Sequence, residues 1–251
     1  MTASPTHLVL IPSYNTGARL IETVREATAH WSSVWVVIDG STDGSERGLD
    51  DAAARLPGLR VLALDQNRGK GAAILHGLKL AATAGFTHVL TMDADGQHPA
   101  NHIGRFMAAS RADPAAMILG RPVFDEHAPA LRVQGRRISN WWANVETPGC
   151  SIEDSLFGFR VYPIADLVAV MDGTRWMRRF DFDPEAAVRL CWRGLRSINL
   201  AAPVRYLRAD EGGVSHFHYG RDNLLLAWMH LRLVLGALSR LMRRPRGSGI
   251  H

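Results

Sequence analysis

Four short apolar runs alternate with amphipathic stretches over the first hundred residues, and this alternation constrains the fold more than any other feature. The runs are Leu8–Ile11, Val34–Ile38, Leu59–Leu64 and His88–Met92, and the stretches between them are Gly17–His30, Ser45–Arg55 and Gly69–Ala84. Strands that alternate with helices predict a parallel, Rossmann-like sheet covered by helices. Because such sheets bind ligands outside the carboxyl ends of their strands, we expect a site among the residues that follow each run.

A polar cluster follows each of the four runs. The clusters are Pro12–Asn15, Asp39–Gly44, Asn67–Gly71 and Asp93–His98. One such cluster alone is typical of a capped turn, since Asp, Asn, Ser and Gly favour turns and helix N-caps. Four in succession at one edge of a sheet indicate instead a site for a nucleotide diphosphate.

Asp93 and Asp95 give the sharpest signal. Two acids spaced i, i+2 where a strand ends can point to the same side and offer oxygen ligands to Mg²⁺ or Mn²⁺. Such a cation would neutralise a diphosphate leaving group while the bond between a sugar C1 and phosphate breaks. An EF-hand is excluded because no Glu closes a twelve-residue loop. Gly69, Lys70 and Gly71 are followed by Ala72 and Ala73, so the GK[ST] of a P-loop is missing. Ile74 stands where a dinucleotide fingerprint needs its third glycine, so both sites are disfavoured.

Taken together, these motifs resemble family 2 glycosyltransferases, and most of all their polyprenol-phosphate (dolichyl-phosphate) mannosyltransferase-like branch. The resemblance is carried by Ile11–Asn15, Ile38–Ser45, Asn67–Ile74, Met92–Pro99, Asp154–Arg160, Phe182–Glu185 and 206–216. It implies a GT-A fold, in which a Rossmann-like, mostly parallel sheet is flanked by helices. The activity it implies is metal-dependent, inverting transfer of a sugar, of the hexosyltransferase type, from a UDP- or GDP-sugar. Ile38 replaces the first of two acids that the family usually carries before Gly40, so base recognition is left open.

The resemblance also implies roles for individual residues. Those expected to bind the nucleotide sugar are Pro12, Tyr14, Asn15, Asp39, Lys70, Asp93 and Ala94. Asp95, Gln97 and His216 are expected to hold Mg²⁺ or Mn²⁺, with a structural, hydrogen-bonded histidine as the alternative for His216. The catalytic candidates are Asp154, as a general base for an acceptor hydroxyl or as an orienter of Arg160, and Arg160, as a phosphate ligand or a structural ion pair. Glu185, at a helix start, is expected to compensate the helix dipole or contact substrate.

The C-terminal region from Asp222 to Met242 contains no proline and predicts one amphipathic helix. Its apolar stripe consists of Leu224, Trp228, Leu231, Leu235, Leu238 and Met242. Six arginines and one acid lie between Arg221 and the last residue, whereas the first 220 residues are neutral overall. This pattern predicts either packing against the chain's own domain or a membrane-surface helix with arginines on lipid phosphates. His230 and Arg232 interrupt the apolar run, which disfavours a membrane span, and nucleic acid is disfavoured because no aromatic stacking surface accompanies the arginines.

We therefore expect a GT-A domain over residues 1–220 and a basic amphipathic helix with a short tail over 221–251. The expected partners are a nucleotide-sugar donor and a lipid-linked or membrane-associated acceptor, with the protein peripheral on the cytoplasmic face of a membrane. Two cysteines, Cys150 and Cys191, are too few for a disulfide framework and favour a reducing compartment. The first residues lack the pattern of a signal peptide.

Residues 113–149 have weak periodicity and are expected to form an edge strand and a mobile loop over the site. A nucleotidyltransferase that makes a nucleotide sugar is disfavoured, because Pro12–Asn15 is not a Gly-rich phosphate loop. A non-catalytic protein that binds nucleotide sugar or lipid is the other alternative, against which Asp93, Asp95 and Gln97 argue.

Overall fold

A seven-stranded sheet in the order β3-β2-β1-β4-β6-β5-β7 forms the centre of the computed structural model, which describes residues 4–124, 130–204 and 219–243. The strands are β1 (His7–Ser13), β2 (Val34–Asp39), β3 (Leu59–Leu64), β4 (His88–Thr91), β5 (Ala116–Val123), β6 (Arg160–Pro163) and β7 (Arg196–Pro203). Strand β6 runs antiparallel to β4 and β5, and the other neighbouring pairs are parallel. The four apolar runs of the sequence are thus β1 to β4, and the predicted Rossmann-like half is confirmed.

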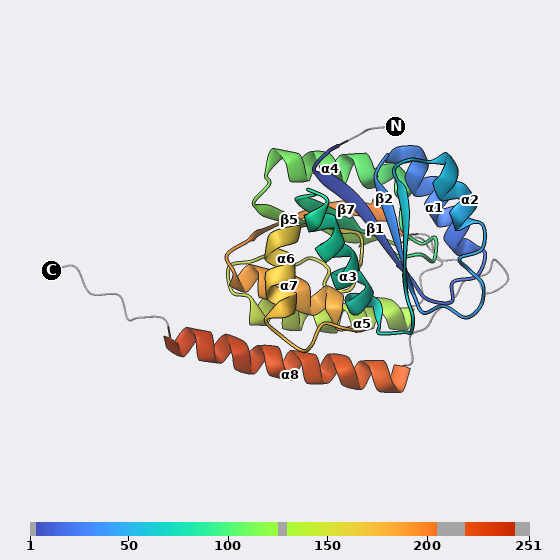
Figure 1. The fold of residues 1–251 in the computed structure, drawn as a ribbon. Helices are drawn as coiled ribbons and strands as arrows, with labels where there is room; N and C mark the ends of the chain where they lie inside the picture. Colours follow the sequence, from blue (N-terminus) through green and yellow to red (C-terminus); the bar gives the residue numbers. More distant parts are fainter. Residues whose placement is uncertain (1–3, 125–129, 205–218, 244–251) are drawn as a thin grey trace.

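Helices cover both faces of this sheet (Figure 1). They are α1 (Arg19–His30), α2 (Leu49–Arg55), α3 (Lys70–Thr83), the 3₁₀ turn η1 (Ala100–His102), α4 (Ile103–Ala112), α5 (Ala130–Glu146), α6 (Ile164–Asp172), α7 (Phe182–Trp192) and α8 (Tyr219–Arg243). Side chains alternate along β1, so Leu8 and Leu10 join one core with α3, α6 and α7, while Val9 and Ile11 join the other with α1, α2 and α4. The expected fold class, a mostly parallel sheet flanked by helices, is confirmed.

The stretch 113–149 differs from its prediction. Strand β5 is internal, between β6 and β7, and is not an edge strand. Residues 130–146 form α5, a 17-residue helix, where a loop was expected; residues 125–129 lie outside the described part of the chain. Ile138, Trp141 and Val145 are spaced i, i+3, i+7 and form one exposed apolar face, while Ala143 is buried in the core. A helical period was therefore present in the sequence, although the prediction did not use it.

The predicted apolar stripe of α8 is its exposed face. Leu224 is 74% exposed and Met242 is 80% exposed, and the four residues between them on the stripe are about half exposed. The opposite face packs on the domain through Met229 and Leu233, which are buried. In Figure 1, α8 lies along one side of the domain next to α5. The helix therefore does both things that the sequence left open, since it packs on its own domain and still presents an apolar stripe.

Arginines of α8 also anchor it. Both terminal nitrogens of Arg232 bond to the carboxylate of Glu185, at 3.2 and 3.0 Å, and its guanidinium lies 4.0 Å from the ring centroid of Trp176. The guanidinium of Arg240 lies 4.8 Å from the ring centroid of Trp192. The expectation that these arginines contact lipid phosphates is wrong for Arg232, whose charge is used inside the protein.

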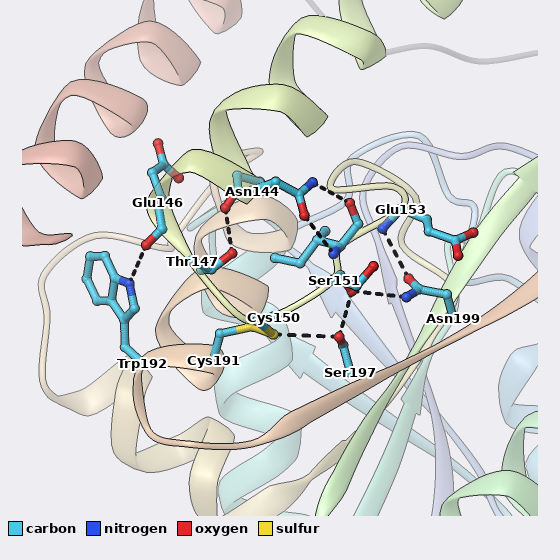
Figure 2. Close-up of a disulfide and its surroundings, with 12 residues drawn as sticks. Asn144, Glu146, Thr147, Cys150, Ser151, Glu153, Cys191, Trp192, Ser197 and Asn199 are labelled. Atoms are coloured by element: carbon cyan, nitrogen blue, oxygen red, sulfur yellow. Dashed lines mark hydrogen bonds between the residues drawn. A yellow bond between two sulfur atoms is a disulfide. The ribbon is translucent and has the colours of Figure 1, made fainter.

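A disulfide joins Cys150, which follows α5, to Cys191 in α7 (Figure 2). The two Cα atoms lie 6.1 Å apart, and Trp192 donates its indole N–H to the carbonyl of Glu146 beside the bond. The cysteine count could not reveal this pairing, because it depends on the packing of two elements 41 residues apart. Disulfides are rare in reducing compartments, and the compartment that the cysteine count favoured stays a prediction.

Candidate active site

A cavity of about 1140 Å³ opens at the carboxyl ends of β1, β2 and β4, where the sequence places its polar clusters. The predicted site residues that line it are Pro12, Tyr14, Asp39, Lys70, Asp93, Ala94, Asp95 and Gln97. Asn15 lies outside the lining: its side-chain oxygen accepts the backbone N–H of Thr42 at 2.8 Å, and its own N–H donates to Ser41 Oγ at 3.1 Å. Asn15 therefore joins the turns after β1 and β2, and its expected nucleotide contact remains a prediction.

Asp39 ties the end of β2 to the loop before α3. Its two carboxylate oxygens accept the backbone N–H groups of Arg68 and Gly69, each at 2.8 Å, and one also accepts the side-chain amide of Asn67. Gly40 allows this approach, because its φ is +64° and a Cβ there would meet the backbone of Asn67 at 2.4 Å. Asp39 thus shapes the cavity wall, with both carboxylate oxygens already hydrogen-bonded to the loop.

Lys70 connects two carboxylates at the cavity floor. Its ammonium lies 2.6 Å from Asp93 Oδ1 and 2.7 Å from Asp183 Oδ2. The following residue, Gly71, permits this placement, because a Cβ there would meet the carbonyl of Met177 at 2.1 Å. Burial would lower the pKa of Lys70, but the two carboxylates outweigh burial and raise it, so the ammonium stays charged.

His98 orients Asp93. Its Nδ1 accepts the backbone N–H of Asp93 at 2.9 Å, which leaves the ring proton on Nε2, 3.5 Å from Asp93 Oδ2. Burial lowers the pKa of His98 to about 4, so the ring is neutral at pH 7. Burial would raise the pKa of Asp93, but Lys70 and then His98 lower it to about 2. Asp93 is therefore an ionised carboxylate with a fixed orientation.

Asp95 has the opposite electrostatics. Its Oδ1 accepts the backbone N–H of Gln97 at 3.0 Å. Burial, followed by repulsion from Asp93, raises its pKa to about 6. Asp95 is thus a carboxylate whose charge is poorly compensated by the protein, which is what a site for a cation requires.

The donor set at this floor fits Mg²⁺ or Mn²⁺ in part. In the portion of the chain that the structure describes, no three His, Cys, Asp or Glu side chains converge to hold a metal ion. Mg²⁺ is commonly held by one or two carboxylates, with substrate phosphates and water as the other ligands. Asp95, which lines the cavity together with Asp93 and Gln97, meets that requirement for an ion that arrives with a diphosphate. His216, the other predicted ligand, lies outside the described residues.

Asp154 and Arg160, the two catalytic candidates, are both buried and occupied. Asp154 Oδ1 accepts backbone N–H groups of Leu156 and Phe157 and the guanidinium of Arg136, all within 2.9 Å. Arg160 donates to the carbonyls of Asp154, Phe157 and Asp183 and to the Tyr162 hydroxyl. These contacts favour the orienting alternative for Asp154, through its carbonyl, and a structural one for Arg160; neither residue lines the cavity.

Glu185 also serves the fold. Its carboxylate is fully buried and binds Arg189 at 2.7 Å as well as Arg232. Of its two expected roles, contact with substrate and compensation of the helix dipole, only the second remains. Sequence reasoning missed Asp183, two residues earlier, although it had singled out Phe182–Glu185. The sequence does show Asp183 directly before a proline at a helix start. A carboxylate is favoured at that position by the helix dipole alone, so the pattern did not distinguish a site residue from a structural one.

The cavity continues between α5 and α8, away from the carboxylates. Its lining there includes Ile138, Ser139, Trp142, Leu226, Ala227, His230, Leu231 and Val234. His230 is held at both ring nitrogens, with Nδ1 2.8 Å from Glu146 Oε1 and Nε2 3.1 Å from Ser139 Oγ. One polar end and one largely apolar groove therefore belong to the same cavity.

Comparison with known proteins agrees with this arrangement. The family model described as "Glycosyl transferase family 2" matches residues 8–183. The undecaprenyl-phosphate mannosyltransferase of Micrococcus luteus is 27% identical over 257 residues, which cover 91% of this chain and 98% of that protein. The polyprenol monophosphomannose synthase of Mycolicibacterium smegmatis is 30% identical over 179 residues, which cover 64% of this chain and 63% of that protein.

Solved structures share the fold. Glucosyl-3-phosphoglycerate synthase from Mycobacterium tuberculosis, in complex with Mn²⁺, UDP-glucose and phosphoglyceric acid, superposes with a TM-score of 0.59 at 19% sequence identity. The match covers 98% of this chain and 83% of that one. At this identity the likeness concerns the fold alone.

Proposed function

The chain belongs to glycosyl transferase family 2, and from this membership and its cavity we propose that it moves a sugar from a nucleoside-diphosphate sugar to a polyprenol phosphate at a membrane surface. The similarity to undecaprenyl-phosphate and polyprenol sugar transferases supports the acceptor class. The donor class is supported by the polar clusters that line the cavity at the ends of β1, β2 and β4.

The observation that carries the proposal is the continuity of the cavity. Asp93 and Asp95 lie at one end, and the groove between α5 and α8 forms the other. Ile138 and Leu231 line this groove and are also more than half exposed on the outer surface. A lipid chain that enters between the two helices would bring its phosphate close to the donor, as direct displacement at the sugar C1 requires.

Different side chains at the polar end of the cavity would bind the metal, keep Asp93 ionised and attract the acceptor phosphate. Asp93 and Asp95, with Gln97, would hold Mg²⁺ or Mn²⁺, which when bound supplies charge stabilisation for the diphosphate leaving group. Lys70 would keep Asp93 ionised and in place. Arg136, Arg179 and Arg221 line the cavity and would attract the acceptor phosphate. A phosphate acceptor is already a nucleophile, so no general base is needed, and the buried state of Asp154 is compatible with this.

Membrane contact would come from the exposed apolar face, which we define as Ile138, Trp141 and Val145 of α5 with Leu224, Trp228, Leu231, Leu235, Leu238 and Met242 of α8. Isolated apolar residues are ordinary on a surface, but a continuous set on two packed helices marks an interaction site. By length and composition Gly220–Met242 is also a candidate span among the described residues. Because Arg232 is bound to Glu185 and Met229 to the core, we favour a peripheral helix lying in the interface. The cytoplasmic side and the division at residue 220 stay predictions.

Nucleotide binding tests the donor half of the proposal. Isothermal titration with UDP and with GDP, each with and without Mn²⁺, should show metal-dependent binding of one of the two. If neither binds under any condition, the chain is not a nucleotide-sugar enzyme, and the non-catalytic alternative takes its place.

The exposed apolar face gives a second prediction. Replacing Leu235 and Leu238 by glutamate should weaken binding to anionic phospholipid vesicles by about 100-fold, since each buried leucine contributes about 1.5–3 kcal/mol. Both side chains are exposed, so nucleotide binding and thermal stability should stay unchanged. Vesicle co-sedimentation measures the effect.

A matched control carries glutamate at Ala29 of α1 and Ala54 of α2, which are exposed on other elements and give the same change in net charge. If this control weakens vesicle binding as much as the α8 variant, net charge and not the apolar face governs the contact. Equal binding by both variants and the unmodified protein would contradict the proposed membrane surface.

A further inference from the structure

Asp183 carries a buried carboxylate oxygen that no described residue satisfies. The residue is 5% exposed and lines the cavity. Its Oδ2 lies 2.7 Å from the ammonium of Lys70, whereas its Oδ1 has no hydrogen-bond partner in the part of the chain that the structure describes. An unsatisfied buried acceptor is costly, and in a binding site it commonly marks the place of a ligand group.

The position of this carboxylate is fixed by the fold. Asp183 is the second residue of α7, and its backbone carbonyl accepts a hydrogen bond from the buried Arg160. The ammonium of Lys70 bridges it to Asp93. The Asp183 carboxylate is therefore linked through the Lys70 ammonium to Asp93, one of the carboxylates expected to hold the metal and the diphosphate.

The chemistry of this place selects the group that can occupy it. Two carboxylates share one ammonium there, and Asp95 adds a third negative charge nearby, so a phosphate or another carboxylate would be repelled. Phosphate oxygens also accept hydrogen bonds and cannot donate to Oδ1, whereas a sugar hydroxyl can. A second metal ion would have to compete with the ammonium that already holds Oδ2.

We propose that Asp183 recognises the sugar of the donor by accepting a hydrogen bond from one of its hydroxyls, and that this sugar is neutral rather than a uronate. The inference rests on the proposed function, in which the sugar follows the diphosphate into the cavity. It assigns Asp183 a role in donor specificity that is separate from metal and nucleotide binding.

The test compares sugar nucleotide with bare nucleotide. In the Asp183→Asn variant, with Mn²⁺ present, the affinity for UDP or GDP should stay within about threefold of the unmodified protein, while the affinity for the matching hexose nucleotide should fall by about 10- to 100-fold, the range for a hydrogen bond to a charged group. Asp166→Asn is the matched control, since Asp166 is a partly exposed residue that pairs with Arg193 on the surface. Thermal unfolding checks that both variants fold.

A second measurement keeps the proposal falsifiable if the variant is unstable. Among hexose nucleotides that each lack one hydroxyl, a single analogue should bind the unmodified protein 10-fold or more weakly, and uronate nucleotides should bind weakly as well. Equal loss of bare nucleotide and sugar nucleotide in Asp183→Asn would overturn the proposal, as would a lower kcat with unchanged donor affinity. If the unmodified protein binds hexose nucleotide and the variant binds it equally, this inference alone fails; if the unmodified protein binds no nucleotide, the proposed function fails.

Discussion

Replacing Asp95 with asparagine is expected to reduce sugar transfer by about 100-fold or more, the range found when one electrostatic contact to a developing charge is removed. Asparagine keeps the side-chain oxygen that accepts the N–H of Gln97, so the loop conformation should persist. It removes the negative charge that is expected to bind the metal. Initial rates of nucleoside-diphosphate release, measured across a Mn²⁺ titration, report the loss.

The same substitution should stabilise the metal-free protein, and the sign follows from the raised pKa of Asp95. Its pKa in the folded state is about 6, against 3.8 in a model compound. Its ionisation therefore disfavours folding, with no effect at pH values well below 3.8 and the full effect above about 6. The gain in free energy of unfolding for Asp95→Asn should be about 3 kcal/mol at pH 7.5 and near zero at pH 3.5.

Urea unfolding at the two pH values measures this difference, and Asp43→Asn serves as a control because Asp43 is exposed and its pKa is lowered, not raised. A destabilised Asp95→Asn at pH 7.5 would contradict the electrostatic account of the floor. Activity that survives the substitution would contradict the metal-binding role.

Replacing Glu185 with glutamine is expected to lower the free energy of unfolding by about 3 kcal/mol. The buried carboxylate holds Arg189 and Arg232, and its loss leaves the largely buried guanidinium of Arg232 without this ion pair. Removing one partner of a buried ion pair typically costs about 3–5 kcal/mol. Because Arg232 belongs to α8, the packing of this helix on α7 should weaken, which urea unfolding and proteolysis within α8 both detect.

The double variant Glu185→Gln with Arg232→Met provides the matched control. Methionine fills a similar volume without a charge, so the double variant should recover part of the lost stability. If the single variant loses less than about 0.5 kcal/mol, the ion pair does not anchor α8. If the double variant loses more free energy of unfolding than the two single variants lose in sum, the packing of Arg232 on Trp176 contributes more than its charge.

The sheet and the floor of the site could be predicted because their signals are local. Each of the first four strands is a short apolar run that is followed by a polar cluster, and parallel strands bring those ends to one edge. Pro12, Asp39, Lys70, Asp93 and Asp95 were therefore expected in one place, and they line one cavity. Their functional roles remain predictions.

The rest depended on packing between distant elements. The interpretation of the C-terminal stripe left its orientation open, because α8 has apolar residues on both sides. On the inner side Met229 and Leu233 are buried in the core and Leu226 packs against it. The pairing of Cys150 with Cys191 depends on where α5 ends relative to α7. Asp183 gains its significance from Lys70, which is 113 residues away in sequence.

Sugar transfer to a lipid phosphate tests the central claim most directly. The purified protein would be incubated with undecaprenyl phosphate in anionic vesicles, a panel of UDP- and GDP-sugars and Mn²⁺, and the extracted lipid analysed by mass spectrometry. The account predicts a glycosyl-phospholipid from one donor, formed only with the divalent metal and at least about 100-fold less with Asp95→Asn. Release of nucleoside diphosphate without any glycosylated lipid, or equal lipid product in the presence of a chelator, would contradict it.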